Sequence, residues 1–246
     1  ALLRRHGLML PPPKPRHTTN SNHRYHKWKN LIHGFEPMAA NQLWVADITY
    51  IMLNNGDVCY LHLITDAYSR MIVGWELADT LRASITIKAL EQAISQTGGV
   101  SLEGLTHHSD RGVQYCCDDY VRMLQTHKIK ISMTEDYNPT DNAIAERANG
   151  VIKTETVYSR KTFNSLEHAR NVIGRFIHFY NYRRPHMSIG YKIPAVVHTE
   201  TGAQKKMWKK KNYPKKAYNN GNNGISLPCR TTGADDGCNH HTVYSI

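Results

Sequence analysis

The order of strands and helices that the sequence predicts is the feature that most restricts the fold of this chain. Apolar runs of strand length come first, and from residue 82 they alternate with stretches of helical period. The expected strands cover residues 43–53, 58–65, 71–77, 105–109 and 129–133, and the expected helices cover residues 82–96 and 118–127. This order predicts an α/β fold in which helices flank a five-stranded mixed sheet.

Turn residues support these boundaries. Asn54-Asn55-Gly56-Asp57 separates the first two strands, and Asn-Gly tolerates the positive φ values of a tight hairpin turn. Gly98-Gly99 follows the helix at 82–96, where a glycine commonly ends a helix. We therefore expect the first two strands to form an antiparallel hairpin.

Positive charge is concentrated at the two ends of the chain. The 246 residues carry a formal net charge of +11, to which residues 1–43 contribute +6, residues 44–200 contribute −1 and residues 201–246 contribute +6. A nearly neutral centre between two basic ends favours a polyanionic partner, with the basic ends holding phosphates. The alternative is that both ends are merely solvated.

Length and composition predict one main domain with two extensions. We expect a basic, proline-containing arm or linker over residues 1–40, a folded core over residues 41–202 and a tail over residues 203–246. The tail is basic at first and then rich in Asn and Gly, so we expect it to be disordered.

Cysteine usage and hydropathy predict the compartment. The chain has five cysteines and no Cys-x-x-Cys pair, which favours reduced thiols over a disulfide framework. It has neither an apolar run as long as a membrane span nor the apolar core of a secretory signal. We expect a soluble, cytoplasmic protein with no membrane partner.

Three acidic residues are candidates for a metal site. Asp47 lies on an expected buried strand, where an unpaired carboxylate is costly. Asp110 follows the strand at 105–109, at the end where open α/β sheets form sites, although it could instead be a turn residue before Arg111. Glu146 alone would be an ordinary exposed helix acid. Together the three offer the carboxylate oxygens that Mg²⁺ and Mn²⁺ prefer.

The residues around Glu146 predict a helix with one polar face. Asn142, Glu146, Asn149 and Lys153 fall at i, i+4, i+7 and i+11, while apolar residues occupy other positions. Residues 139–142 include a proline and short polar side chains, which favour a capped helix start. Glu146 can therefore face a cleft while the apolar side packs on the sheet.

Four motifs occur in a fixed order along the chain. They are Trp44-x-x-Asp47-Ile48-Thr49, His108-Ser109-Asp110-Arg111-Gly112-x-Gln114-Tyr115, Asp141-Asn142-Ala143-x-Ala145-Glu146 and Tyr180-Asn181-x-x-Arg184-Pro185-His186. Over residues 30–210 the chain resembles the integrase catalytic core of bacterial insertion-sequence transposases of the DDE type, cousins of retroviral integrases. The resemblance implies an RNase H-like fold and an integrase core between the two basic extensions.

The same resemblance implies a polynucleotidyl transferase that nicks element ends and joins their 3′-hydroxyls to target DNA by transesterification. Asp47, Asp110 and Glu146 would be the catalytic residues and would hold Mg²⁺ or Mn²⁺ as two ions, with Asp47 bridging them. The implied partners are double-stranded DNA at element ends and target, and a second copy of the chain in a homodimer or larger assembly. Residues 1–30 resemble the end of the family's region after a helix-turn-helix, so a separately encoded helix-turn-helix protein is a further candidate partner.

Two other functions fit the sequence. One is an RNase H-like nuclease that only hydrolyses, and the other is a non-catalytic DNA-binding remnant of a transposase. Joining of labelled donor DNA to a second duplex would separate the first from a transferase, and absence of metal-dependent cleavage would indicate the second.

Several basic and polar residues are candidates for DNA contact. Asn149 and Lys153 share the helix face of Glu146, although Lys153 could equally be solvated. The Arg183-Arg184 pair suits phosphate, or else braces the last core helix. Lys209, Lys210 and Lys211 lie among aromatic residues, as in segments that track nucleic acid, and a tail without fixed structure is the alternative.

Overall fold

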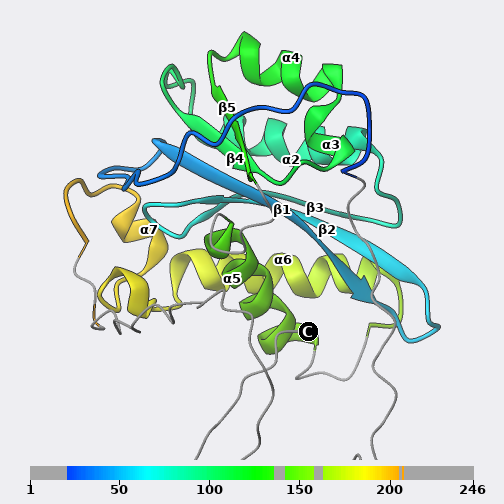
Figure 1. Ribbon diagram of the computed structural model, residues 1–246. Coiled ribbons are helices and arrows are strands. Elements are labelled where there is room, and N and C mark those ends of the chain that lie inside the picture. The colour runs from blue at the N-terminus through cyan, green and yellow to red at the C-terminus, as the bar shows by residue number, and fades with distance from the viewer. Residues whose placement is uncertain (1–20, 136–141, 158–162, 205–206, 208–246) are drawn as a thin grey trace, which may run out of the picture. The chain divides into compact units, whose positions relative to one another are not determined.

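The computed structural model describes residues 21–135, 142–157, 163–204 and 207. Its centre is a five-stranded sheet with helices on both faces (Figure 1). The strands are β1 (Leu43–Met52), β2 (Val58–Asp66), β3 (Ile72–Ala78), β4 (Thr106–Ser109) and β5 (Lys130–Met133), in the order β3-β2-β1-β4-β5. The predicted α/β class is confirmed.

The sheet is mixed because β1 pairs with strands of both directions. β1 runs antiparallel to β2 and parallel to β4, while β3 is antiparallel to β2 and β5 is parallel to β4. The predicted hairpin joins β1 to β2: Gly56 has a φ of 86°, and the amide of Leu53 donates to the carbonyl of Asp57 at 2.9 Å. β1 is therefore the middle strand of the sheet.

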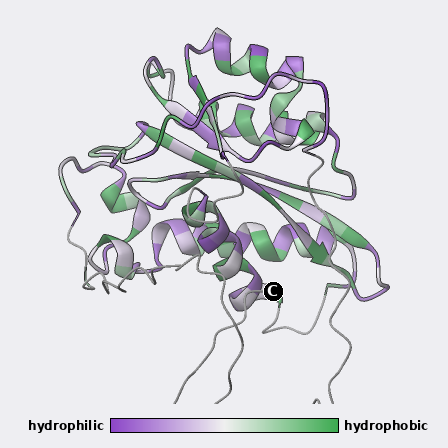
Figure 2. Cartoon of the chain, in the orientation of Figure 1, coloured by the Kyte–Doolittle hydropathy of each residue, from purple (hydrophilic) through white to green (hydrophobic). Residues whose placement is uncertain are grey.

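Helices cover both faces of the sheet. They are α2 (Ala83–Gln96), α3 (Val113–Cys116), α4 (Asp118–Thr126), α5 (Ala143–Ile152), α6 (Leu166–Tyr182) and α7 (Pro194–Val197), with a π-helical turn η1 (Lys153–Val157) and a short 3₁₀ helix η2 (Met187–Ile189). α2, α3 and α4 lie on one face, and α5 and α6 lie on the other (Figure 1). Hydrophobic and hydrophilic residues alternate along α4 and α6, as expected for helices with one buried side (Figure 2).

The predicted strands and the helices at 82–96 and 118–127 match the structure to within one residue at each end. No bounds were predicted for α3, α6, α7, η1 or η2. α3 and η2 are each a single turn, and such short segments show no repeating apolar period that a sequence pattern could reveal.

Alternation along β1 decides which face each side chain occupies. Trp44 and Ile48 pack in a cluster with residues of α2 and α4, whereas Val45 packs with Ala145 of α5. Successive side chains of a strand point to opposite faces, so Asp47 points to the face that α5 covers. This parity is what aims the carboxylate toward Glu146.

α2 approaches β3 so closely that a side chain would not fit between them. A Cβ on Gly74 would lie 2.1 Å from the carbonyl oxygen of Ala89 on α2. Glycine at this strand position therefore allows the helix and sheet backbones to meet directly.

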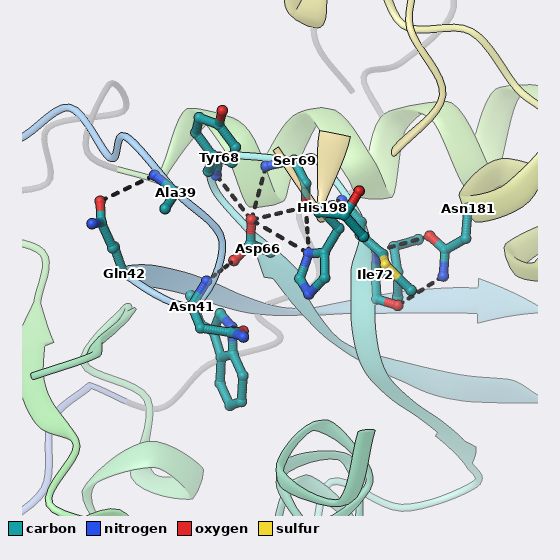
Figure 3. A network of polar contacts seen from close by, with 12 residues as sticks. Ala39, Asn41, Gln42, Asp66, Tyr68, Ser69, Ile72, Asn181 and His198 are labelled. Carbon is teal, nitrogen blue, oxygen red and sulfur yellow. Dashed lines mark hydrogen bonds and ion pairs between the residues drawn. The ribbon is translucent and has the colours of Figure 1, made fainter. Parts of the chain in front are cut away.

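A buried carboxylate holds three segments together at the end of β2 (Figure 3). Asp66 is fully buried and accepts hydrogen bonds from the amides of Asn41, Tyr68 and Ser69 and from the Ser69 hydroxyl, all at 2.8–3.1 Å. The Ser69 hydroxyl also lies 2.9 Å from Nδ1 of His198. Asp66 thus connects the segment before β1, the β2–β3 turn and the segment after α7.

The segment after α7 makes further contacts with the same turn. The Tyr68 hydroxyl donates to the carbonyl of Gly202 at 3.0 Å, and Gln204 donates to that hydroxyl at 2.6 Å. The described chain therefore follows the core as far as Gln204. Of the residues predicted to form the tail, most lie outside the described residues.

Two findings concern the expected compartment. Cys59, Cys116 and Cys117 are free thiols, and Cys229 and Cys238 lie outside the described residues. Within the described part of the chain, no helix is both long enough and apolar enough to cross a membrane.

Candidate active site

Asp47 is held from two sides. One carboxylate oxygen accepts from the amide of Ile48 at 2.9 Å, and the other accepts from the side-chain amide of Asn149 on α5 at 2.7 Å. The side chain is partly accessible to solvent rather than sealed in the core. A strand carboxylate whose position is fixed by hydrogen bonds is suited to hold a ligand that reaches it from the α5 side.

Asp110 comes to the same place through the parallel pairing of β1 and β4. Val45 pairs with His108, and the same register continued by two residues sets Asp110 beside Asp47. One oxygen of Asp110 accepts a hydrogen bond from the amide of Gly112 at 2.9 Å. Asp110 is therefore also a turn residue, which was the alternative interpretation of its place in the sequence. The two roles are compatible because a carboxylate has further lone pairs.

Glu146 lies in the first turn of α5 and is exposed. The start of the helix is docked on β1 by Asn142, whose side-chain amide donates to the carbonyl of Ala46 at 3.2 Å. The expectation of a side-chain cap is not met at Asn142, which occupies the N-cap position without a capping bond. Its side chain is used to join helix and strand, and residues 139–141 lie outside the described residues.

The three carboxylates act on one another electrostatically. Burial raises the pKa of Asp47 from 3.8 to about 7, and the charges of Asp110 and Glu146 raise it as well. The hydrogen bonds from Ile48 and Asn149 oppose this increase because they favour the charged carboxylate. Like charges that penalise each other's ionisation create a site that a cation would stabilise.

The carboxylates are near neighbours but do not form a closed set of metal ligands. Within the described ranges, no three His, Cys, Asp or Glu side chains are grouped closely enough to hold an ion. The segment 136–141, which leads into α5, is outside those ranges. Since Glu146 is exposed, rotation of its own side chain can bring it closer to Asp47.

The predicted polar face of α5 is present, but the sequence did not predict that Asn149 would hold Asp47 in place. Asn149 is only 5 % exposed, and its side-chain amide donates a hydrogen bond to Asp47. Lys153 lies with its Nζ 4.2 Å from the centre of the Tyr50 ring, and burial lowers its pKa while the charge of Asp47 raises it. The i, i+3 spacing from Glu146 to Asn149 was the available sequence signal for a site residue.

The two predicted arginines differ in their contacts. Arg184 forms an ion pair with Glu155 of η1, with Nε 3.1 Å from one carboxylate oxygen, whereas Arg183 is exposed. Arg184 therefore braces the end of α6 against η1. Lys209, Lys210 and Lys211 lie outside the described residues.

Removal of the Asn149 contact should raise the pKa of Asp47. We expect Asn149→Leu, which keeps the volume and excludes water, to raise it by about one pH unit, because one hydrogen bond to a charged group is lost. NMR titration of the Asp47 carboxyl carbon measures this value. Asn171→Leu, on the exposed side of α6, is the control, and equal Asp47 titrations in both variants would contradict the assignment.

Comparison with known families identifies the family of the chain. Two models of the integrase core domain match overlapping parts of the chain, residues 37–139 and residues 127–194. The chain belongs to the integrase core family. The matched residues span all five strands and continue through α5 and α6.

Insertion-sequence proteins are among the relatives of this integrase core. A 31 kDa protein of insertion element IS600 from Shigella sonnei is 40 % identical over 184 residues, which cover 74 % of this chain and 66 % of the relative. A protein named as a transposase of insertion sequence element IS986/IS6110 from Mycobacterium tuberculosis is 36 % identical over 174 residues, which cover 70 % of this chain and 62 % of the relative. The matched residues thus span less than two thirds of the length of each of these relatives.

Solved structures agree on the fold. A chain of the simian T-cell lymphotropic virus intasome superimposes with a TM-score of 0.57 at 18 % identity, covering 79 % of this chain and 67 % of that chain. The HTLV-2 integrase catalytic core domain in complex with magnesium gives a TM-score of 0.51 at 21 % identity, covering 66 % of this chain and 99 % of that domain. The RNase H-like fold that the motifs implied is confirmed.

Proposed function

We propose that this integrase core catalyses metal-dependent cleavage of DNA and joins the resulting 3′-hydroxyl ends to target DNA, as part of transposition. The observation that carries the proposal is the approach of Asp110 and Glu146 to Asp47, whose pKa is raised first by burial and further by these two charges. The insertion-sequence relatives support the biological setting.

Asp47, Asp110 and Glu146 are the proposed ligands for Mg²⁺ or Mn²⁺, and we assign two ions to this site. These residues fit hard cations because their donors are carboxylate oxygens, and the repulsion at Asp47 would be relieved by positive charge. When bound, such ions neutralise phosphate oxygens and lower the pKa of an attacking hydroxyl or water.

The protein's own residues have distinct tasks in this chemistry. Asp47 must lose its proton before it can act as a ligand, and because its pKa is raised to about 7, the metal-free carboxyl is only partly ionised near neutral pH and a bound cation would favour the ionised form. Asn149 orients the Asp47 carboxylate through the 2.7 Å hydrogen bond, and so acts as a positioning residue. Lys153 presents a cation on the same side of α5, where it can hold a phosphate of the bound strand.

A strand-transfer assay tests the proposal. Labelled duplexes carrying candidate element ends are incubated with the full chain, an unlabelled target duplex and Mg²⁺. We expect labelled donor strands to become covalently joined to the target. Cleavage without joining would favour the hydrolytic nuclease, and duplex binding without metal-dependent cleavage would favour the non-catalytic remnant.

The proposed partners are element-end and target DNA, together with a second copy of the chain, because joining two ends requires their pairing. A separately encoded helix-turn-helix protein is a further proposed partner for recognition of the ends. The division into an arm at 1–40, a core at 41–202 and a tail at 203–246 is retained as part of this proposal, as is action in the cytoplasm.

The basic tail is proposed to contribute affinity rather than chemistry. Deleting residues 208–246 removes six Lys/Arg and two Asp. If Lys209, Lys210 and Lys211 contact phosphates, the slope of log affinity against log salt should become shallower by about 3, since each lost contact accounts for about 0.9. Fluorescence anisotropy with a labelled duplex measures this slope.

A matched full-length variant separates the three lysines from the rest of the tail. Replacing Lys209, Lys210 and Lys211 by Gln should reproduce most of the change that the deletion causes. Metal-dependent cleavage should remain detectable in both variants at high protein concentration. A salt slope equal to that of the wild type would show that the tail does not touch DNA.

A further inference from the structure

A cavity of about 690 Å³ lies on the other flank of α5, away from the contact between Asp47 and Asn149. Its wall is formed by α5, the end of β2, the turn that follows it, the end of α6 and the segment through η2. The polar residues that matter for its chemistry are Thr65, Arg70, Arg147, Tyr180, Arg184 and His186. Among the described residues that line it, none is acidic.

Arg70 brings buried and unmatched donors to this cavity. Its Nε and Nη1 atoms are inaccessible to solvent and have no hydrogen-bond partner in the described part of the chain. The hydroxyl of Thr65, a residue that is only 1 % exposed, is likewise buried and has no hydrogen-bond partner in the described part of the chain. Buried donors without partners are costly, so the guanidinium of Arg70, which lines the cavity, lacks the compensation that an acceptor bound there would give it.

The nearest internal carboxylate is already engaged. Asp66 interacts electrostatically with Arg70, but it accepts hydrogen bonds from the amides of Asn41, Tyr68 and Ser69 and from the Ser69 hydroxyl (Figure 3). Arg70 itself has a φ of 69°, in the left-handed region, which places it in the tight turn after β2. Arg70 lines the cavity and forms no ion pair with an acid in the described part of the chain.

The other two arginines carry different amounts of uncompensated charge. Arg184 is neutralised by Glu155, whereas Arg147 is exposed and forms no ion pair within the described ranges. All three guanidiniums act on the same neighbour: burial is the main cause that lowers the pKa of His186 to about 4, and Arg184, Arg70 and Arg147 lower it further. The cavity therefore combines an excess of positive charge with hydrogen-bond donors.

We propose that this cavity binds a backbone phosphate of the DNA strand on which the active site acts, with Arg70 as the buried donor and Arg147 as the donor at the rim. Guanidinium groups suit a tetrahedral oxyanion because they donate in parallel pairs. The inference rests on the proposed function. It adds a second point of contact on the far side of the helix that carries Glu146.

The position of the cavity fits one continuous strand. A helix with its side chains is about 10–12 Å across, and a DNA strand advances about 3.4 Å per nucleotide along the duplex axis. A strand that crosses α5 would therefore place a phosphate in the cavity about three nucleotides from the phosphate at Asp47. Such a contact would fix the register of the strand at the active site.

Duplex binding by the full chain in EDTA tests the proposal without any contribution from bound metal. The variants are Arg147→Gln and Arg70→Gln, and the matched control is Arg122→Gln on α4, which removes the same charge from the other face of the sheet. We expect Arg147→Gln to weaken binding about tenfold at low salt and to lower the salt slope by about 0.9, while the control changes neither. Arg70→Gln should act in the same direction, and its melting temperature shows whether it is folded.

Inorganic phosphate serves as the probe for the cavity alone. It should raise the melting temperature of the wild type and the control by the same amount, and that of Arg147→Gln by less. If the phosphate shift is lost in Arg147→Gln but its salt slope equals that of the control, the cavity binds another anion, such as an acidic peptide, and the DNA assignment is overturned. If Arg147→Gln matches the control in both measurements, the cavity binds no phosphate.

These outcomes remain distinct from failure of the proposed function. A wild type that binds duplex normally while Arg147→Gln behaves as the control overturns only the cavity. A wild type that binds no duplex at all overturns both, since neither the active site nor the cavity then meets DNA.

Discussion

We expect Asp47→Asn, Asp110→Asn and Glu146→Gln each to lower metal-dependent cleavage and joining about a thousandfold, while duplex binding in EDTA persists. Each amide keeps the shape of the side chain but removes the charge that binds a divalent ion. Metal ions contribute several kcal/mol of transition-state stabilisation, and about 4 kcal/mol corresponds to a factor of a thousand in rate. The strand-transfer assay under single-turnover conditions measures the loss.

A control for this comparison is Asp118→Asn, an exposed acid in the first turn of α4. It should retain wild-type cleavage and joining because it lies outside the proposed metal site. Circular dichroism and the melting temperature of each variant show whether the fold is intact. A folded variant at Asp47, Asp110 or Glu146 that keeps most of its joining activity would remove that residue from the catalytic set.

The strands and the two acids associated with them could be predicted because local patterns decide them. Apolar alternation and the Asn55-Gly56 turn determine the β1–β2 hairpin, and strand parity then determines the face on which Asp47 lies. Asp110 could be located because it directly follows an apolar strand. The order of strands and helices along the chain was therefore enough to predict a five-stranded mixed sheet.

Contacts between distant residues could not be predicted in the same way. The hydrogen bond of Asn149 to Asp47 spans 102 positions, and the ion pair of Arg184 with Glu155 spans 29. Neither follows from the periodicity of one element, because each depends on how two elements pack. Arg184 also shows that a basic residue expected to contact DNA can instead pair with an acid of the same chain.

The cavity beside α5 could not be predicted from the sequence for the same reason, because it forms between elements that are distant in the chain. Arg70 belongs to the turn after β2 and Arg147 to α5, and no motif connects them. Its lining forms only when the β2–β3 turn, α5 and the segment after α6 come together. Sequence patterns describe each of these segments but not the space between them.

Asp47 should make the metal-free protein less stable as the pH rises from about 4 to 7. The pKa of Asp47 rises from the ordinary value of 3.8, which applies to the unfolded chain, to about 7 in the folded protein. Across this range the folded state therefore keeps a proton that the unfolded state has lost. Stability therefore falls as the pH rises through this range, and the full cost is present above pH 7. Asp47→Asn has no such ionisation, so its stability should vary less with pH.

The expected size follows from the pKa increase. Even if half of it is realised, the ionisation of Asp47 costs about 2 kcal/mol, which corresponds to about 5 °C in the melting temperature of a domain this large. At pH 8 in EDTA, Asp47→Asn should thus melt about 5 °C above the wild type, and at pH 4 the two should coincide. Thermal unfolding followed by circular dichroism from pH 4 to 8 measures both curves.

Mg²⁺ should reverse this order. A cation among the three carboxylates stabilises the ionised form of Asp47, so saturating Mg²⁺ should raise the melting temperature of the wild type more at pH 8 than at pH 5. Asp47→Asn should show a much smaller increase at either pH, because one of the proposed ligands is missing. Parallel pH curves for the two proteins, or equal Mg²⁺ shifts, would place the metal site away from Asp47.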